Sequence, residues 1–93
     1  MTLLLKDPDA VLDYLVDWGA EYLGGDTVAQ SDWIVVPDEP GGVTVAGDSF
    51  DESSSTVNAA GGIAGRLYRL VNRVTTASGR IDSRSITLRV EKR

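Results

Sequence analysis

Two runs of alternating apolar residues in the last third of the chain constrain its fold most strongly. The residues that share a parity are Tyr68, Leu70 and Val74 in the first run and Ile86, Leu88 and Val90 in the second. A repeat of two residues is typical of a β-strand with one buried face. The polar segment 75–80 between the runs predicts a turn. We therefore expect residues 61–93 to form two long strands folded back on each other.

Upstream of this hairpin the chain shows shorter segments with strand character, separated by turn signals. We expect these strands at 3–5, 12–18, 27–36, 43–45 and 56–59. The segment 10–23 also fits a helical stripe with Asp9 as its N-cap. Its β-branched and aromatic residues favour the strand 12–18, which turns Asp13 and Asp17 to water and is followed by a loop or a single helical turn.

Three irregularities are expected in this part of the chain. Ser31 and Asp32 interrupt the alternation, so a bulge or bend is expected there. The short strand 43–45 is expected at a sheet edge, and 47–55 is expected to be an exposed loop because Phe50 is its only apolar residue. Short strands separated by turns are typical of a β-sandwich or a small barrel.

The composition excludes several classes of function. The chain has 93 residues and contains neither cysteine nor histidine. We expect a single domain, 1–93, without disulfides, thiolate or imidazole metal sites, or catalysis by a cysteine or histidine. Residues 1–8 match neither a signal peptide nor a membrane span, so we expect the chain to stay in the cytosol unless it leaves in an assembly.

The charged residues are divided unevenly along the chain. The net charge is −5, which makes nucleic acid a poor partner. Residues 1–65 hold twelve acids and one base, giving −11, whereas residues 66–93 hold eight bases and two acids, giving +6. In the favoured interpretation, acidic strands pair with basic strands inside one domain. The alternative is a subunit with one acidic and one basic face, suited to head-to-tail contacts in a ring.

No motif predicts catalysis or a cofactor. The glycine-rich segment 61–65 lacks the lysine of a P-loop, and we interpret it as a tight connection between strands. The acids of 47–55 do not match the spacing of an EF-hand, so we interpret them as solvated loop residues. Trp18 and Trp33 offer rings for stacking on sugars, but the large area that a tryptophan buries favours core positions for both.

One constellation at the start of the hairpin is more specific. Gly65 shortly precedes Tyr68 at the beginning of the penultimate strand, as in the tyrosine corner of immunoglobulin-like sandwiches. The Tyr68 hydroxyl would then bond back to the backbone upstream, and Trp33 would be the buried tryptophan of the third strand. The alternative is an unrelated antiparallel sheet with an incidental tyrosine.

The fold expected from these residues is all-β, an immunoglobulin-like antiparallel sandwich of about seven strands. The side chains expected in its core are Tyr14, Trp18, Trp33, Leu70, Val74, Ile86, Leu88 and Val90. Alternation turns Arg69, Arg73 and Arg89 outward, and these arginines are the candidate assembly contacts on the basic part of the chain.

A pattern of spaced residues extends over most of the chain, from about Lys6 to Val90. It consists of Leu12-Asp13-Tyr14, Asp17-Trp18, Leu23, Gly25-Asp26-Thr27, Ser31, Trp33, Gly61-Gly62, Ala64-Gly65, Tyr68, Asn72-Arg73-Val74-Thr75-Thr76, Gly79-Arg80, Asp82 and Arg84-Ser85-Ile86-Thr87-Leu88. This pattern resembles small structural proteins of tailed bacteriophages, the fibre–tail adaptor-like family. It departs from that family at 55–60, where members often have a bulkier apolar strand.

The resemblance implies an immunoglobulin-like component of the virion, at the tail, the fibre adaptor or the head–tail region. It implies no enzymatic activity and no cofactor, and a location in the virion after assembly from the host cytoplasm. The implied partners are other virion proteins and further copies of the chain, with neither nucleic acid nor membrane. The alternatives are a carbohydrate- or receptor-binding sandwich that uses exposed aromatic residues and the acidic loop, or a capsid decoration protein.

Overall fold

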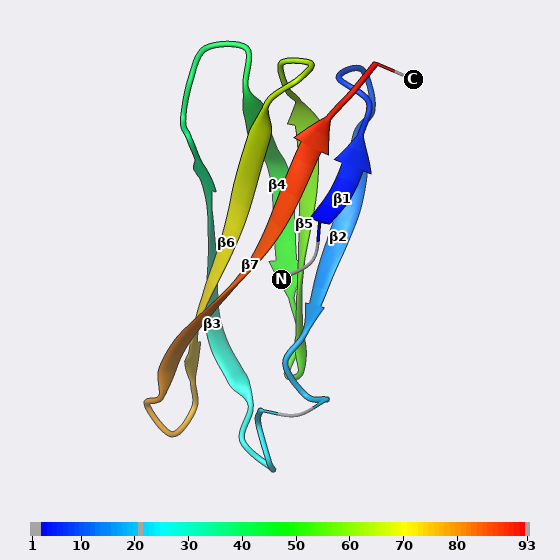
Figure 1. Ribbon diagram of the computed structural model, residues 1–93. Coiled ribbons are helices and arrows are strands. Elements are labelled where there is room, and N and C mark those ends of the chain that lie inside the picture. The colour runs from blue at the N-terminus through cyan, green and yellow to red at the C-terminus, as the bar shows by residue number, and fades with distance from the viewer. Residues whose placement is uncertain (1–2, 21, 93) are drawn as a thin grey trace.

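Two β-sheets packed face to face make up the fold (Figure 1). The computed structural model describes residues 3–20 and 22–92, and this part of the chain contains seven strands and no helix. The strands are β1 (Leu3–Lys6), β2 (Leu12–Asp17), β3 (Val28–Val36), β4 (Val43–Phe50), β5 (Ser54–Gly61), β6 (Leu67–Thr76) and β7 (Ile81–Val90). The predicted all-β sandwich of about seven strands is confirmed.

The strand order separates the two ends of the chain from its middle. One sheet has the order β1-β7-β6-β3 and the other the order β2-β5-β4. All pairs are antiparallel except β1 with β7, which is parallel. When the strands are lettered A to G along the chain, these orders are A-G-F-C and B-E-D. Immunoglobulin sandwiches likewise place C, F and G in one sheet and B, E and D in the other.

The β6–β7 hairpin is the centre of the larger sheet, and its alternation fills the core. Every second residue of β6 from Tyr68 to Thr76 is buried, and in β7 the buried residues are Ile86, Leu88 and Val90. The other buried apolar residues are Val16, Trp18, Leu23, Val28, Val43, Val57 and Ala59. They come from all the other strands except β1 and from the connection after β2, so the two sheets share one core.

Several strand bounds and the position of one bulge differ from the sequence prediction. The expected loop 47–55 is wrong at both ends, because β4 continues to Phe50 beside β5 and β5 starts at Ser54. Its polar residues fit a strand because β4 is an edge strand whose last residues, Asp48 to Phe50, stay exposed, and a bulge between Val45 and Gly47 shifts its register. The bulge of β3 lies between Val28 and Gln30, not at Ser31 and Asp32. The expected turn 75–80 is shorter, because β6 includes Thr76 and β7 starts at Ile81.

A chain of buried polar groups joins the two sheets across the core. The indole N–H of Trp18 donates to Oδ1 of Asn72 at 2.8 Å, and both residues are fully buried. The amide of Asn72 donates to Oγ of Ser31 at 2.9 Å and to the carbonyl of Asp32 at 3.0 Å. Ser31 in turn donates to Oγ of Ser55 in β5 at 3.0 Å. The inward-facing polar residues of β3, β5 and β6 therefore satisfy one another.

Lys6 makes a second link between the sheets. Its side chain is fully buried at the end of β1, and Nζ donates to the carbonyl oxygens of Gly61 in β5 at 2.6 Å and of Asp7 at 2.9 Å. Burial disfavours the charged ammonium and lowers the pKa of Lys6 below its usual value, while the charge of Asp7 opposes the shift. Sequence reasoning did not identify this buried base, because a lysine at a strand end is ordinarily exposed.

The double glycine after β5 is required by space as well as by backbone conformation. Gly62 has a φ of 117°, and a Cβ built there would lie 2.7 Å from Cγ2 of Val90 and 3.1 Å from Cγ2 of Val43. These two valines are buried on opposite sheets. A side chain at position 62 would therefore press on both sheets at once.

Replacing Gly62 with alanine should destabilise the fold by about 2–4 kcal/mol, because the positive φ and the clash with Val90 act together. The matched control is Gly65→Ala, since Gly65 also has a positive φ, 86°, but a Cβ there meets nothing within 4 Å. This control should cost only about 1 kcal/mol. Urea unfolding measures the free energy of unfolding of both variants. An equal loss of stability in the two variants would contradict the steric argument.

Candidate assembly interface

The outer face of the larger sheet mixes arginines with exposed apolar side chains. On β6, Arg69, Val71 and Arg73 point away from the core, opposite in parity to the buried Tyr68, Leu70 and Asn72. Their neighbours on β3 are Val36, Ile34 and Asp32, and their neighbours on β7 are Thr87, Ser85 and Ser83. Leu67 lies opposite Arg89, and Leu3 and Leu5 extend the same face on β1. We call this surface the basic face.

The two central arginines of the basic face are free to meet a partner. Within residues 3–20 and 22–92, the side chains of Arg69 and Arg73 make no hydrogen bond or ion pair. Arg89, in contrast, pairs with Glu91 at 2.8 Å. A groove of about 360 Å³ beside Arg73 is lined by Asp32, Ile34, Val71, Arg73 and Ser83. All three arginines expected at an assembly contact lie on the basic face. Arg69 and Arg73 have no ion-pair partner in the described residues.

The outer face of the smaller sheet has the opposite charge. Asp13, Leu15 and Asp17 point outward from β2, and Leu15 is 58% exposed. Beside them β5 presents Asn58, Thr56 and Ser54 in register. No lysine or arginine occurs between residues 7 and 65, so the strands of this sheet contain no base. We call this surface the acidic face.

Ion pairs between the acidic and basic parts of the chain lie at the ends of the sandwich, not across its strands. Three of the four pairs in the described residues join the two parts: Glu39–Arg66, Asp26–Arg80 and Asp9–Lys92. All three involve connecting segments or the residues after β7. The favoured expectation placed acidic strands beside basic strands, and β3 and β6 are such neighbours, with Asp32 opposite Arg73. In the described residues no ion pair joins these two side chains.

Tyr68 ties two connecting segments to the start of β6. Its buried hydroxyl accepts a hydrogen bond from the backbone N–H of Ile63 at 3.2 Å and donates to Oε1 of Glu39 at 2.7 Å. Burial and the bond to Glu39 raise the pKa of Tyr68 above its usual value. Gly65, which lies between Ile63 and Tyr68 in the sequence, donates its backbone N–H to the carbonyl of Val90 at 2.7 Å. The contact with Glu39 was not expected, because Glu39 is 29 residues away in the sequence.

Removing the Tyr68 hydroxyl with Tyr68→Phe should lower the free energy of unfolding by about 1 kcal/mol, because two partners lose a hydrogen bond. Tyr14→Phe is the matched control, since the buried Tyr14 hydroxyl has no partner in the described part of the chain. That variant should be neutral or slightly stabilising. Chemical denaturation measures the free energy of unfolding of the two variants. A Tyr68→Phe variant as stable as wild type would contradict a structural role for this hydroxyl.

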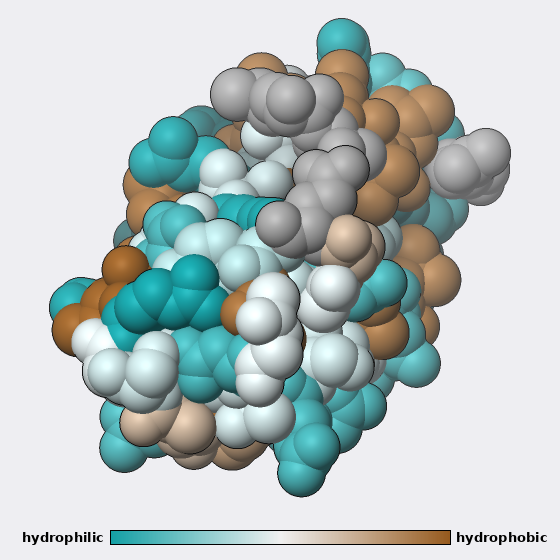
Figure 2. All heavy atoms as spheres, turned by 90° about the horizontal axis from the view of Figure 1, so that it is seen from below, coloured by the Kyte–Doolittle hydropathy of each residue, from teal (hydrophilic) through white to brown (hydrophobic). Residues whose placement is uncertain are grey.

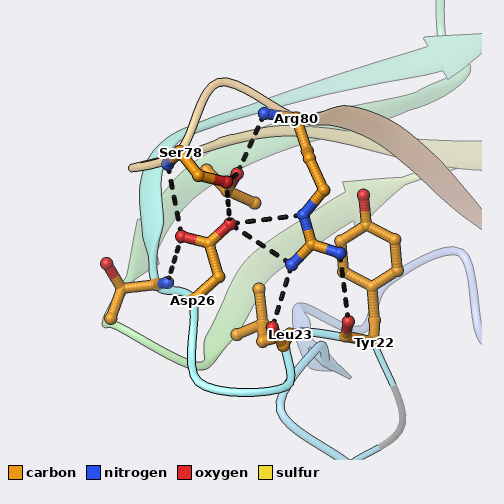
Figure 3. A network of polar contacts seen from close by, with 7 residues as sticks. Tyr22, Leu23, Asp26, Ser78 and Arg80 are labelled. Carbon is orange, nitrogen blue, oxygen red and sulfur yellow. Dashed lines mark hydrogen bonds and ion pairs between the residues drawn. The ribbon is translucent and has the colours of Figure 1, made fainter.

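Asp26 is the centre of a polar cluster that fixes the β2–β3 connection to the β6–β7 turn (Figure 3). Its carboxylate accepts hydrogen bonds from the hydroxyl of Ser78 at 2.5 Å, the backbone N–H of Thr27 at 2.9 Å and the Arg80 guanidinium at 3.2 Å. Arg80 also donates to the carbonyl of Leu23 at 2.9 Å and lies over the ring of Tyr22, with Cζ 4.6 Å from its centroid. These internal partners give the cluster a structural role.

The hydrogen bonds from Ser78, Thr76, Thr27 and Arg80 hold the pKa of Asp26 far below its ordinary value of 3.8. The stability that this carboxylate contributes is therefore present above pH 3.8 and lost as the pH falls through its lowered pKa. Asp26→Asn should lower Tm at neutral pH, and the difference from wild type should shrink below pH 3.8. Thermal scans against pH measure this. Asp48→Asn, at an exposed position, is the control and should leave the profile unchanged.

The aromatic residues expected in the core occupy different depths. Trp18 is fully buried and forms an edge contact with Tyr22 at 5.3 Å. Trp33 and Tyr14 are only partly buried, because β3 and β2 are edge strands. Trp33 lines a groove of about 280 Å³ between β3 and β4, and its indole N–H has no partner in the described residues. The fully buried tryptophan of this sandwich is thus Trp18, not Trp33.

The end of the molecule that carries the β2–β3 connection is mainly polar. Figure 2 views this end and shows hydrophilic and weakly polar residues over most of it, with hydrophobic residues toward the margins. At this end Asp51 accepts hydrogen bonds from Ser53 and Ser54, which close the β4–β5 turn and lower the pKa of Asp51.

Among the described residues, no cluster of acids could hold a metal ion. No helix of residues 3–20 or 22–92 could cross a membrane.

The family model described as podophage GP4 fiber-tail adaptor protein gp77 matches residues 6–89. The chain belongs to this family. The predicted resemblance to fibre–tail adaptor-like proteins of tailed phages is thereby confirmed, and the chain is a structural component of a phage virion. A comparison with curated proteins gave no match.

The family match covers the centres of both charged faces. Arg69, Arg73, Asp13 and Asp17 all lie within residues 6–89, as do the core strands β2 to β6. Leu3 and Leu5, at the margin of the basic face, lie outside it. The charged residues at the centres of both faces therefore lie within the part of the chain that the family model matches.

Proposed function

We propose that this adaptor is a non-enzymatic subunit of the podophage tail that joins other virion proteins through its basic face. The observation that carries the proposal is the pair of unpaired arginines, Arg69 and Arg73, on either side of Val71 and next to the exposed Ile34. Arginine is enriched in protein interfaces and lysine is depleted, and the buried core of an interface is more apolar than the rest of the surface. All the bases of this face are arginines.

The shape of the molecule supports contact through a sheet face. The two longest extents of the chain are 41 and 21 Å, so one sheet face covers roughly 860 Å². That area is close to what each partner buries in a protein interface of standard size, about 800 Å². The connecting segments at both ends are already held by internal bonds of Tyr68 and Asp26. The faces therefore offer the larger unpartnered surface.

The fold that presents these faces is, in our proposal, a single immunoglobulin-like domain with a tyrosine corner at Tyr68 and Gly65. The strand order B-E-D and G-F-C supports this proposal, and so does the hydrogen bond from the backbone N–H of Ile63 to the Tyr68 hydroxyl. Such sandwiches serve widely as non-catalytic modules. The domain would act in the virion after assembly in the host cytoplasm, without a cofactor.

Charge reversal of the basic face should block assembly of the adaptor into particles. Arg69→Glu with Arg73→Glu would replace two attractive contacts by repulsive ones, and we expect the variant to be absent from purified particles. Mass spectrometry of particles assembled with each variant measures incorporation. The control, Arg66→Glu with Lys92→Glu, changes the net charge equally at exposed sites outside this face. It should be incorporated normally.

Both variants should unfold at temperatures close to that of wild type, because exposed charges contribute little to stability. Normal incorporation of the Arg69 and Arg73 variant would overturn the role of the basic face.

A further inference from the structure

The acidic and basic faces carry the same arrangement of side chains with opposite charge. On β2 the outward residues are Asp13, Leu15 and Asp17, and on β6 they are Arg69, Val71 and Arg73. Each face thus has a charge, an apolar residue and a charge on one strand. Outward positions of a strand recur every two residues, about 6.6 Å, so the two charges of each row are separated by about 13 Å.

From this match we propose that the partner of the basic face is the acidic face of a second copy of the chain. Arg69 and Arg73 would pair with Asp13 and Asp17 of the next copy, with Val71 against Leu15 between them. Both rows are symmetric about their apolar centre, so they fit in either strand direction. This inference rests on the proposed function, because it names the protein that the basic face meets.

The surroundings of the two rows fit this pairing. Beside Val71, Ile34 is 58% exposed, and the equally exposed Leu15 projects from the acidic face toward solvent. The neighbours of the aspartates on β5 are Asn58, Thr56 and Ser54, which add no base that would repel the arginines. On the basic face Asp32 lies opposite Arg73, whereas the neighbours of Arg69, Val36 and Thr87, are uncharged. Asn58 donates a hydrogen bond to Asp13, which holds that carboxylate in place.

The contact is heterologous, because it joins two different faces. A pair of copies in contact keeps one free basic face and one free acidic face, one on each copy, so growth does not stop at two copies. Two basic faces in contact would instead bring four unpaired arginines together, which disfavours a symmetric pair. The pairing therefore gives the assembly a direction.

Mixing two neutralised variants tests this pairing in solution. The basic-face variant is Arg69→Gln with Arg73→Gln, and the acidic-face variant is Asp13→Asn with Asp17→Asn. Each variant alone should stay monomeric, because each has lost one side of the contact. Mixed in equal amounts they should form a complex of one copy of each and nothing larger, since only one matching pair of faces remains. Sedimentation velocity measures these masses.

Wild-type protein should form species larger than a dimer at about 0.05 M salt and dissociate at about 1 M salt, where the screening length falls to about 3 Å. Control variants with equal charge changes outside both faces, Arg66→Gln with Lys92→Gln and Asp38→Asn with Glu52→Gln, should assemble like wild type. The pairing is overturned if wild type is monomeric, if it stops at a dimer, if either face variant assembles like wild type, or if the mixture stays monomeric.

The particle assay separates this inference from the proposed function. A monomeric wild-type protein whose incorporation still depends on Arg69 and Arg73 would mean that a different virion protein covers the basic face. In that case the proposed function stands and the pairing between copies falls. Self-association with normal incorporation of the charge-reversed variant would overturn the proposed function instead.

Discussion

The hydrogen bond between the Trp18 indole and the Asn72 side chain is the constraint on which the arrangement of the two sheets depends. An asparagine at a fully buried position of β6 costs free energy unless its amide is satisfied, and here Trp18, Ser31 and Asp32 supply its partners. These partners come from two separate parts of the chain, the connection after β2 and strand β3. A shift of β6 by one residue would turn Asn72 to solvent and leave the indole N–H unpaired, so the polar group specifies the register that apolar packing alone leaves open.

At the two ends of the sandwich, further polar side chains hold the connecting segments in place. Tyr68 and Glu39 hold the connections at one end, and Asp26 and Arg80 hold those at the other. Because these side chains are satisfied internally, they offer little to a partner. Arg69 and Arg73, whose side chains lack such partners in the described residues, lie inside β6, away from the connecting segments.

The sequence predicts the parts of this structure that depend on local periodicity. Alternation along 67–76 and 81–90 indicates two strands and turns Arg69 and Arg73 outward, and nothing beyond the nearest residues is needed for that inference. Strand β4 was predicted too short, because Gly47, Asp48 and Ser49 have low strand propensity and form a strand only through pairing with β5. Trp18 lies 54 residues from Asn72 and Glu39 lies 29 residues from Tyr68, so no local pattern could indicate these partners. The bond between Tyr68 and Ile63 spans only five residues and could be predicted locally. The uneven distribution of acids and bases can be read from the sequence. The sheet order is needed to show that the aspartates of β2 and the arginines of β6 lie on opposite faces of the sandwich.

The matching rows on β2 and β6 have a physical origin in the strand itself. Any two strands present outward side chains at the same repeat, so two sheet faces of one chain are always commensurate along the strand direction. Commensurate spacing alone does not select a partner, because it holds equally for two basic faces or two acidic ones. The sign of the charge makes the selection, since like faces repel and unlike faces attract. A sandwich with a row of aspartates on a strand of one sheet and a row of arginines on a strand of the other therefore favours stacking in one direction, which identical rows on both faces would not.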